Sequence, residues 1–577
     1  MLSIKKMIAE VIVARILEIK SDAALDVAVV EQMLEYPPDP KMGDLALPCF
    51  KLSKILRSSP VKIAEGVAEG FSVPAVKRAE AVNGYFNIFL DGEYLAARVV
   101  KETREKGDRF GSPMTGEGRT VVLDYSSPNV AKPFHIGHLG TTVIGHSLKL
   151  LHEFAGYKCI GINYLGDWGT QFGKLITAYR KWGSREEVEE RGIDALVELY
   201  VRVNNAISGD PEKGIDPNPA LADEARAEFR KMEEGDEENI ALWRWFVDIS
   251  LAEYKKTYDQ LGIEFDSYKG ESFYTDKMPA EVQKLRDKGL LKIDDGASIV
   301  DLEEYGMPPC LILKRDGSTL YPTRDIAAAV YRKNTYDFDK AIYVTSAGQS
   351  LHFAQWFKVV ELMGYDWYDK LVHVPYGTVS INGEKLATRT GNVILLRDLF
   401  ALAIEKISAI MDEKNPNLDG KDKIAEEIGV GAVVFYYLSN NRIRDINFVM
   451  DDALNFEGNT GPYVQYTYAR TCSVLAKTEG EAKGELKISA PEEVELLKTL
   501  SKFEETVRDA IDTYEPSVIT RYILDVAGAF NRFYHNCTIL GADDADVKIT
   551  RIALTRAANT VLGNAFGLIC LAKTQKV

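Results

Sequence analysis

The chain has 577 residues and lacks both a cysteine-based metal motif and a long hydrophobic run. Its six cysteines never show the C-x-x-C spacing of a zinc site, and no regular rhythm indicates a disulfide framework. No stretch of 18 apolar residues is present, so we expect neither a membrane span nor a signal peptide. Scattered cysteines of this kind are typical of a reducing compartment, and we expect a cytoplasmic protein.

The chain also lacks an excess of positive charge. It carries 70 Lys and Arg against 86 Asp and Glu, a net charge of −16, which at first argues against a nucleic-acid partner. Residues 183–300 hold 16 basic and 28 acidic residues, whereas residues 1–115 hold 16 of each and residues 456–577 hold 14 and 16. Because local patches rather than net charge decide contacts with phosphates, the acidity does not exclude RNA.

What the sequence does have is the composition of a folded protein, with 46% hydrophobic and 27% charged residues. Its length is sufficient for about three to five domains. We divide it into a small α+β unit (1–115), an α/β domain (116–400), a connecting helical segment (401–455) and an all-α bundle (456–577).

The α/β domain alternates strand and helix, the pattern of a parallel, Rossmann-like sheet. One unit comprises strand 120–125, helix 140–155 and strand 159–164, and another comprises strand 341–345, helix 351–363 and strand 371–376. The acidic and largely helical block 183–300 lies between them as an insertion. In the N-terminal unit we expect helices at 4–19 and 52–68, a strand at 84–90 and a linker at 106–118.

The first chemically informative stretch, residues 126–138, ends in His135-Ile136-Gly137-His138. It runs from the first strand of the sheet into a helix, whose N-terminus offers free N–H groups to a phosphate. Two histidines three residues apart add two donors near the same point. A polar turn with incidental histidines is the alternative, and the position directly after a strand favours the phosphate site.

A second stretch, residues 381–392, places glycines around two cations, Lys385 and Arg389. These cations could clamp phosphates from a mobile loop. Taken alone, the stretch is more consistent with a solvated basic loop.

A third set is dispersed along the chain at strand ends and helix starts. Open α/β sheets bind ligands at the carboxyl edge of the sheet, where these positions meet. Two carboxylates with tyrosine, asparagine and glutamine suit a cationic ligand with several donors, such as a guanidinium. Each residue alone could instead be a cap or a turn former, and Asp325 in particular a helix N-cap. The set is Asp124, Asn129, Tyr321, Asp325 and Gln349.

His135–His138 matches the HIGH motif of class I aminoacyl-tRNA synthetases, and the surrounding blocks resemble the arginyl-tRNA synthetases in particular. The blocks occur in family order between about residues 120 and 470, and the N-terminal unit resembles that family's additional tRNA-contacting domain. They are 126–139, 163–173, 261–266, 270–272, 321–325, 349–352 and 459–470, with Gly43-Asp44 and 83–86 in the N-terminal unit.

The resemblance implies ATP-dependent activation of L-arginine to arginyl-adenylate and its transfer to the terminal adenosine of tRNA(Arg), with release of AMP and pyrophosphate. It implies a class I catalytic domain, an anticodon-binding C-terminal bundle, and ATP with Mg²⁺. We expect a monomer. The resemblance assigns four roles to residues of this chain. The catalytic residues are His135, His138, Lys385 and Arg389, and the ATP-binding residues are Lys132, His135, Gly137, His138, Lys385 and Gly391. The arginine-binding residues are Asp124, Asn129, Tyr321, Asp325 and Gln349, and the tRNA-binding residues are Asn83, Tyr85, Phe86, Tyr463, Tyr466 and Arg470.

Three features depart from the family pattern. The loop from Lys385 reads Lys-Leu-Ala-Thr-Arg-Thr-Gly rather than the usual KMSKS-like sequence, Gly140 stands where an arginine is common, and residues 571–577 lack the usual ending. Two alternatives therefore stay open. One is a class I synthetase for cysteine, glutamate or glutamine, and the other is a non-catalytic tRNA-binding relative.

Overall fold

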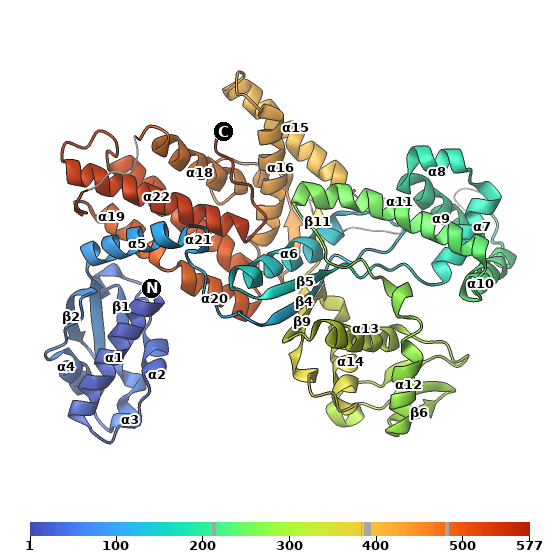
Figure 1. Cartoon of the computed structure of the whole chain (residues 1–577), viewed down its shortest axis with the longest axis horizontal. Coiled ribbons are helices and arrows are strands. Elements are labelled where there is room, and N and C mark those ends of the chain that lie inside the picture. Colours follow the sequence, from blue (N-terminus) through green and yellow to red (C-terminus); the bar gives the residue numbers. More distant parts are fainter. Residues whose placement is uncertain (210–214, 382, 386–393, 479–483, 577) are drawn as a thin grey trace.

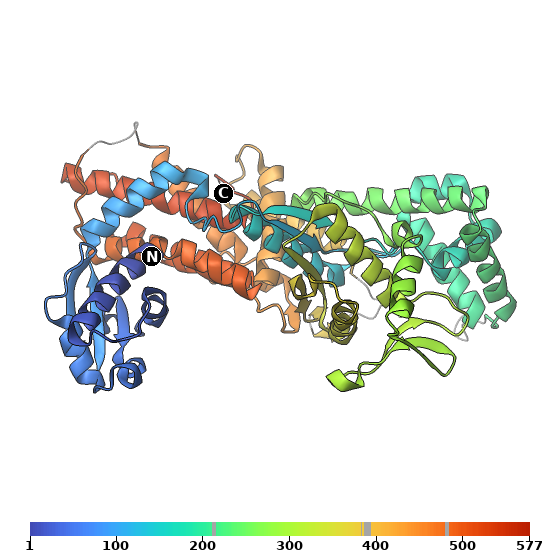
Figure 2. The ribbon, with the colours of Figure 1, turned by 60° about the horizontal axis from the view of Figure 1, so that its bottom comes forward.

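The computed structural model describes residues 1–209, 215–381, 383–385, 394–478 and 484–576. The molecule is elongated, with the N-terminal unit at one end, a cluster of helices at the other and a parallel sheet between them (Figures 1 and 2). In these ranges, no helix is both long and apolar enough to cross a membrane.

The N-terminal unit is an antiparallel sheet covered by helices. Its strands are β1 (Leu45–Pro48), β2 (Val76–Val82) and β3 (Tyr85–Leu90) in the order β1-β3-β2, and α1 (Leu2–Ile19) and α2 (Val27–Met33) accompany them. The expected helix 52–68 is wrong, because the chain forms α3 (Ser53–Leu56) and α4 (Pro60–Ala68) instead. Arg57 adopts a left-handed conformation with φ of 51°, and the Ser59 side chain caps α4.

Helix α5 (Gly92–Lys106) leads from this unit along the C-terminal bundle, where it packs against α19 (Pro491–Ser501) and α22 (Ala545–Gly567) (Figure 1). The expected linker that follows α5 is pinned to the bundle. The Asn564 amide donates hydrogen bonds to the carbonyls of Gly107 (3.0 Å) and Phe110 (3.1 Å). The segment that follows α5 is therefore held against the C-terminal bundle by hydrogen bonds.

The predicted parallel sheet is present. Its strands β4 (Thr120–Asp124), β5 (Lys158–Ile162), β9 (Lys340–Ser346) and β10 (Leu371–Tyr376) lie in the order β10-β9-β4-β5. Helices α6 (Leu139–Phe154) and α14 (Ser350–Leu362) follow β4 and β9. Val121 and Leu123 belong to one hydrophobic core and Val122 to another, so both faces are covered, as a parallel sheet requires.

The chain between β5 and β9 forms two substructures rather than one helical insertion at 183–300. The helices α7 (Thr170–Trp182), α8 (Arg185–Arg191), α9 (Ile193–Ser208), α10 (Pro219–Glu233) and α11 (Glu237–Leu261) share a core of their own. After them come α12 (Met278–Asp287), the antiparallel strands β6 (Leu291–Asp294), β7 (Ala297–Val300) and β8 (Cys310–Leu313), and α13 (Tyr321–Tyr336).

The C-terminal part is helical, as expected, with one exception. Strand β13 (Ile446–Phe448) pairs in parallel with β11 (Val379–Ile381), which pairs with β12 (Glu384–Lys385). One hydrophobic core extends from α1 through the bundle to the sheet. The Arg442 guanidinium donates to the Pro375 carbonyl near the end of β10 at 2.7 Å, so the helical part is fixed to the carboxyl edge of the sheet. The helices are α15 (Leu396–Lys414), α16 (Lys421–Leu438), α17 (Met450–Ala453), α18 (Gly461–Leu475), α19, α20 (Phe503–Thr513), α21 (Ser517–Asn536) and α22.

Candidate active site

A cavity of about 540 Å³ opens at the carboxyl edge of the parallel sheet. Asp124 lies at the end of β4, Tyr321 and Asp325 lie in the first turns of α13, and Gln349 precedes α14. The lining also contains His138 and several residues that the sequence did not single out. All five dispersed residues, Asp124, Asn129, Tyr321, Asp325 and Gln349, therefore meet in one place, although the sequence separates them by more than two hundred positions.

The turn after β4 is strained at three non-glycine residues. Ser126, Ser127 and Ala131 have φ angles of 66°, 46° and 56°, in the left-handed region that L-residues rarely adopt. Such a conformation persists only where the surrounding structure holds it in place, and it concentrates at functional sites.

Helix α11 supplies that support. The Ser250 hydroxyl accepts a hydrogen bond from the Ala131 amide at 3.1 Å, and the Tyr254 hydroxyl lies 2.8 Å from the carbonyls of Asn129 and Lys132. One turn further along, the Tyr258 hydroxyl is 2.7 Å from that of Ser126. The sequence held a signal that we missed, because these three residues recur every four positions on one helix face.

The two histidines are fixed by the backbone of their own turn. The His135 Nδ1 atom accepts from the Gly137 amide (3.0 Å) and the His138 Nδ1 atom accepts from the His135 amide (3.2 Å). In each neutral ring the proton must therefore be on Nε2, which is free to donate to a ligand. Burial lowers the pKa of His138 to about 3 and, together with Lys132, lowers that of His135. Both are neutral donors at physiological pH.

Gly140, where the family often has an arginine, sits one turn beyond the histidines. A Cβ at this position would lie 2.3 Å from the Tyr437 hydroxyl and 3.0 Å from the Tyr376 ring. Two tyrosines, one of which lines the cavity, therefore fill the space where a larger side chain would lie.

Asp124 does not face the cavity as a free carboxylate. Its Oδ2 atom is 2.8 Å from Nη2 of Arg332, and its Oδ1 atom accepts from the Ser127 hydroxyl at 2.9 Å. The Arg332 side chain is only 1% exposed, and burial raises the pKa of Asp124 although the arginine opposes this shift. Asp124 therefore lines the cavity with an internal cation already beside it, which the sequence did not indicate.

Asp325 is bonded to a histidine. Its Oδ2 atom is 2.6 Å from Nε2 of His352, and its side chain is 20% exposed in the cavity. Asp325 is not a helix N-cap, because α13 begins four residues earlier at Tyr321.

A third acid, Glu271, also lines the cavity and was not assigned a role from the sequence. It is paired with Arg324, and burial raises its pKa to about 7. Asp167 accepts hydrogen bonds from the Ser272 amide (2.8 Å) and hydroxyl (2.6 Å), which holds the turn that carries Glu271. Two of the family-like blocks, 163–173 and 270–272, thus meet here.

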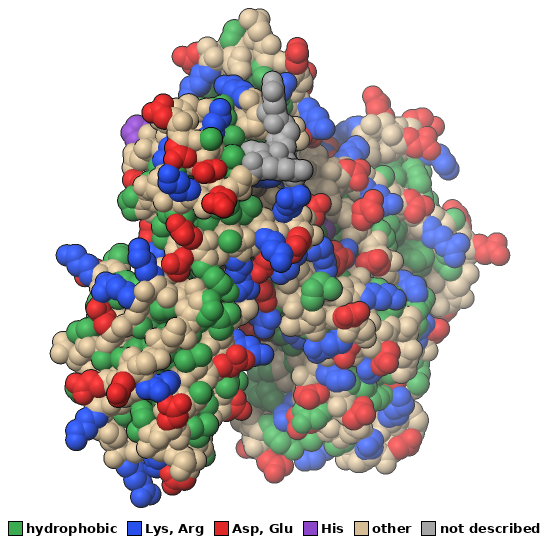
Figure 3. Space-filling view, turned by 60° about the vertical axis from the view of Figure 1, so that its left-hand side comes forward, with side chains coloured by type: hydrophobic (Ala, Val, Ile, Leu, Met, Phe, Trp, Pro, Cys, Tyr) green, Lys and Arg blue, Asp and Glu red, His purple; other side chains and the backbone are tan. Residues whose placement is uncertain are grey.

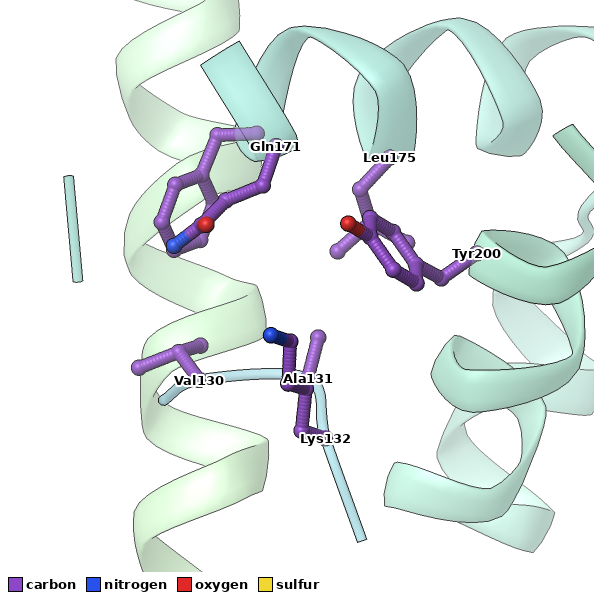
Figure 4. A pocket seen from close by; sticks show the side chains of 7 residues that line it. Val130, Ala131, Lys132, Gln171, Leu175 and Tyr200 are labelled. Carbon is purple, nitrogen blue, oxygen red and sulfur yellow. The ribbon is translucent and has the colours of Figure 1, made fainter. Parts of the chain in front are cut away.

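Lys132 lies beside this cavity rather than in it. Figure 4 shows its side chain in a separate small pocket between Gln171 of α7 and Tyr200 of α9. The lysine still lowers the pKa of His135 and His138 by its charge, so it acts on the same region electrostatically.

The basic loop is anchored at both ends. At its start, β12 pairs with β11, so the backbone of Lys385 is placed opposite Ser380. At its end, Ile394 accepts from the Ile136 amide at 3.2 Å, beside the histidine turn. Arg389 and Gly391 lie outside the described residues.

The N-terminal residues expected to contact tRNA divide into two groups. Phe86 is fully buried in the unit's core and packs on Phe71 at 4.8 Å, so its assignment to RNA contact is wrong. Asn83 is exposed with φ of 51°, and Tyr85 pairs edge-on with the half-exposed ring of Phe50 at 5.4 Å. Asn83 and Tyr85 thus lie where a tRNA could contact them.

In the bundle, Tyr463, Tyr466 and Arg470 line a second cavity of about 600 Å³. The Arg470 guanidinium lies 5.0 Å from the ring centres of both Tyr466 and Tyr534, which are 44% and 42% exposed. Exposed aromatic rings beside an arginine are the side chains on which unpaired RNA bases stack.

No group of three or more His, Cys, Asp or Glu within the described ranges is arranged to hold a metal ion. All six cysteines are free.

A parallel sheet with a histidine-bearing turn after its first strand, and a bundle fixed to its edge, defines a class I aminoacyl-tRNA synthetase. Residues 101–450 match the model of the class I (R) tRNA synthetase catalytic domain. Residues 3–90 match the arginyl tRNA synthetase N-terminal domain, and residues 464–577 match the DALR anticodon binding domain. The chain belongs to the arginyl-tRNA synthetase family.

Relatives and solved structures agree with this placement. The arginine–tRNA ligase of Alkaliphilus metalliredigens is 49% identical over 550 residues, which cover 95% of this chain and 96% of the relative. That of Clostridium perfringens is 46% identical over 577 residues, covering 99% and 100%. The Thermus thermophilus arginyl-tRNA synthetase has the same fold, with a TM-score of 0.82 at 24% identity over 98% and 99% of the two chains.

The family assignment settles the two open alternatives. The protein is an enzyme that activates L-arginine with ATP and attaches it to tRNA, rather than a synthetase for another amino acid or a non-catalytic relative.

Proposed function

We propose that the cavity at the carboxyl edge binds the arginine substrate and the reacting end of ATP side by side. The observation that supports this most strongly is the convergence of Asp124, Asn129, Tyr321, Asp325 and Gln349 on one cavity together with His138. The guanidinium is directed to Asp325, because Asp124 is paired with Arg332 and Glu271 with Arg324. A planar guanidinium bonds carboxylates in a fork that the ammonium of lysine does not reproduce.

In the activation step, an arginine carboxylate oxygen attacks the α-phosphorus of ATP and pyrophosphate leaves. No protein nucleophile is needed, because the attacking carboxylate is already ionised at pH 7. We assign to His135 and His138 the donation of Nε2 hydrogen bonds to the phosphates as charge develops on them. The chain's contribution is positioning and electrostatic stabilisation.

Lys385 and Arg389 are assigned to the departing pyrophosphate. The support is that both ends of their loop are tied to the catalytic edge, one through β11 and the other beside His135. Gly391 is assigned to ATP on the family resemblance alone, as is Lys132. Magnesium remains an expectation from the family resemblance, and we assign no step to it.

For tRNA, we propose contacts from Asn83 and Tyr85 at one end and from Tyr463, Tyr466 and Arg470 in the bundle. Figure 3 shows Lys and Arg side chains interspersed with Asp and Glu over the face on which the N-terminal unit comes forward. Contacts with phosphate are thus expected to be local and few rather than spread over one basic surface. We further propose that the enzyme works as a monomer in the cytoplasm, a reducing compartment that fits its six free cysteines.

The experiment that tests the proposal is ATP-dependent charging of tRNA with each of the twenty amino acids and with citrulline. Citrulline has nearly the shape of arginine but no positive charge. We expect charging with arginine and none with citrulline, because the cavity acids would lose their counter-ion. Charging with citrulline at a rate near that of arginine would overturn the proposed role of the acids.

A further inference from the structure

Each acid that lines the arginine cavity has an internal basic partner, and one of these partners differs in kind. Asp124 pairs with Arg332 and Glu271 pairs with Arg324, and a guanidinium keeps its charge at any physiological pH. Asp325 pairs instead with His352, through Nε2 and Oδ2 at 2.6 Å. Among the lining residues that the structure describes, Asp325 is thus the acid whose partner can lose its charge.

The position of His352 is well defined. It lies in the first turn of α14, and its side chain is 27% exposed and faces the cavity. The next residue, Phe353, is buried and stacks on the His373 ring at 4.3 Å with an interplanar angle of 4°, which fixes the start of the helix. Within the described ranges, the Asp325 carboxylate makes no other hydrogen bond, so its Oδ1 atom is left for a ligand.

We propose that His352 is a positioning and specificity-determining residue for arginine: its neutral ring aligns Asp325 for the substrate guanidinium, and its protonated ring takes the guanidinium's place as counter-ion. The proposal rests on the proposed function, in which this cavity binds arginine. Protonation of His352 and binding of arginine then compete for one negative charge.

The other groups that face His352 limit what else can titrate there. On β10, burial lowers the pKa of His373 to about 4, with smaller contributions from Arg442 and His352, so it is neutral above pH 5. Asp124 on β4 is held by Arg332 on α13. Glu271 is the remaining group, because burial raises its pKa to about 7 while Arg324, on α13, opposes the shift. A test must therefore separate His352 from Glu271.

Two substitutions of His352 make a matched pair. In His352→Gln the amide nitrogen falls near the position of Nε2, so the hydrogen bond to Asp325 is kept but cannot titrate. In His352→Asn the amide falls near Nδ1 and the hydrogen bond is lost. His352→Lys adds a permanent charge beside Asp325. The measurement is the dissociation constant of arginine by isothermal titration calorimetry from about pH 5.5 to 7.5, with the unfolding temperature of each variant as a check of folding.

For the wild type we expect arginine affinity to fall severalfold as the pH is lowered from 7.5 to 5.5, because a protonated His352 ring competes with the guanidinium for Asp325. His352→Gln should bind like the wild type at pH 7.5 and lose most of this pH dependence, and any residual dependence belongs to Glu271. His352→Asn should bind more weakly at every pH, and His352→Lys should bind at pH 7.5 as poorly as the wild type does at low pH.

An unchanged pH profile in His352→Gln would overturn the proposal, as would wild-type affinity in His352→Lys at pH 7.5. If one variant does not fold, the other still decides the question. Failure of the proposed function is a separate result, because arginine affinity would then also be insensitive to substitution of Asp325.

Discussion

Arg332 of α13 forms an ion pair with Asp124 of β4 at 2.8 Å, with both side chains less than 10% exposed. The guanidinium is also 5.1, 6.0 and 5.6 Å from the ring centres of Tyr164, Tyr274 and Tyr343. Arg332 lies two turns from Asp325 on the same face of α13, so this pair joins the helix that carries Asp325 to the strand beneath the cavity.

Removing one member of this ion pair should lower the free energy of unfolding more than removing both members. Arg332→Met leaves a buried carboxylate without a counter-ion, and we expect a loss of about 3–5 kcal/mol in the free energy of unfolding. Arg332→Met combined with Asp124→Asn removes both charges and should recover much of that loss. Chemical denaturation of Arg332→Met, Asp124→Asn and the double variant measures the free energy of unfolding of each. Additive effects of the two substitutions would show that the pair is not coupled.

His138→Ala should lower the rate of arginyl-adenylate formation by roughly 10²–10³, the effect of losing one donor to a developing charge. His138→Gln, which places an amide nitrogen near Nε2, should recover part of it. Because the pKa of His138 is lowered to about 3, the ring stays neutral at higher pH, and its donor should persist from pH 5 to 8. Single-turnover activation with tRNA present measures these rates. An unchanged rate in His138→Ala would refute the assignment.

Tyr254→Phe should slow activation while leaving the chain folded. The substitution removes the hydroxyl that holds the Asn129 and Lys132 carbonyls, and an unsatisfied buried carbonyl costs about 1–3 kcal/mol. We expect a fall of roughly tenfold in kcat/KM for arginine, because the strained turn loses its support. Tyr305→Phe, at a half-exposed ring away from the cavity, is the matched control. Equal effects of the two substitutions would argue against a role for α11.

Tyr85 and Phe86 are adjacent in the sequence but should respond in opposite ways. Phe86→Ala opens the core of the N-terminal unit and should destabilise that unit by about 3–5 kcal/mol. Tyr85→Ala should leave its stability nearly unchanged and raise the KM for tRNA severalfold, with no change in the KM for arginine. Thermal unfolding and charging kinetics separate the two effects, and a stable Phe86→Ala variant with weakened tRNA binding would reverse our assignment.

The sheet and the meeting of five distant residues were predictable from the sequence. Strand–helix alternation predicts a parallel sheet, and the carboxyl ends of its strands meet at one edge, so Asp124 and Gln349 had to be close. The periodicity of residues 84–90 also predicted a strand. It did not show which face is buried, because alternation alone leaves Tyr85 and Phe86 interchangeable. Ser59-Pro60 was an available helix-start signal that the apolar pattern of 52–68 obscured.

The pairings inside the site could not be predicted. Nothing in the sequence indicates that Arg332 bonds Asp124 or that His352 bonds Asp325, because each pair joins elements whose relative rotation is set by tertiary packing. The support from Ser250, Tyr254 and Tyr258 was missed for a different reason. Its spacing was visible, but it lies in the acidic helical block that we described only as an insertion.

The most direct test of the account is the effect of Asp325→Asn on the two substrates of activation. We predict that the KM for arginine rises by about a hundredfold, equivalent to about 2.7 kcal/mol, while the KM for ATP changes by less than about twofold. Asp337→Asn, an exposed acid at the far end of the same helix, should change neither. If Asp325→Asn raises both KM values together, or leaves the KM for arginine unchanged, Asp325 does not recognise the guanidinium and the account of the cavity is wrong.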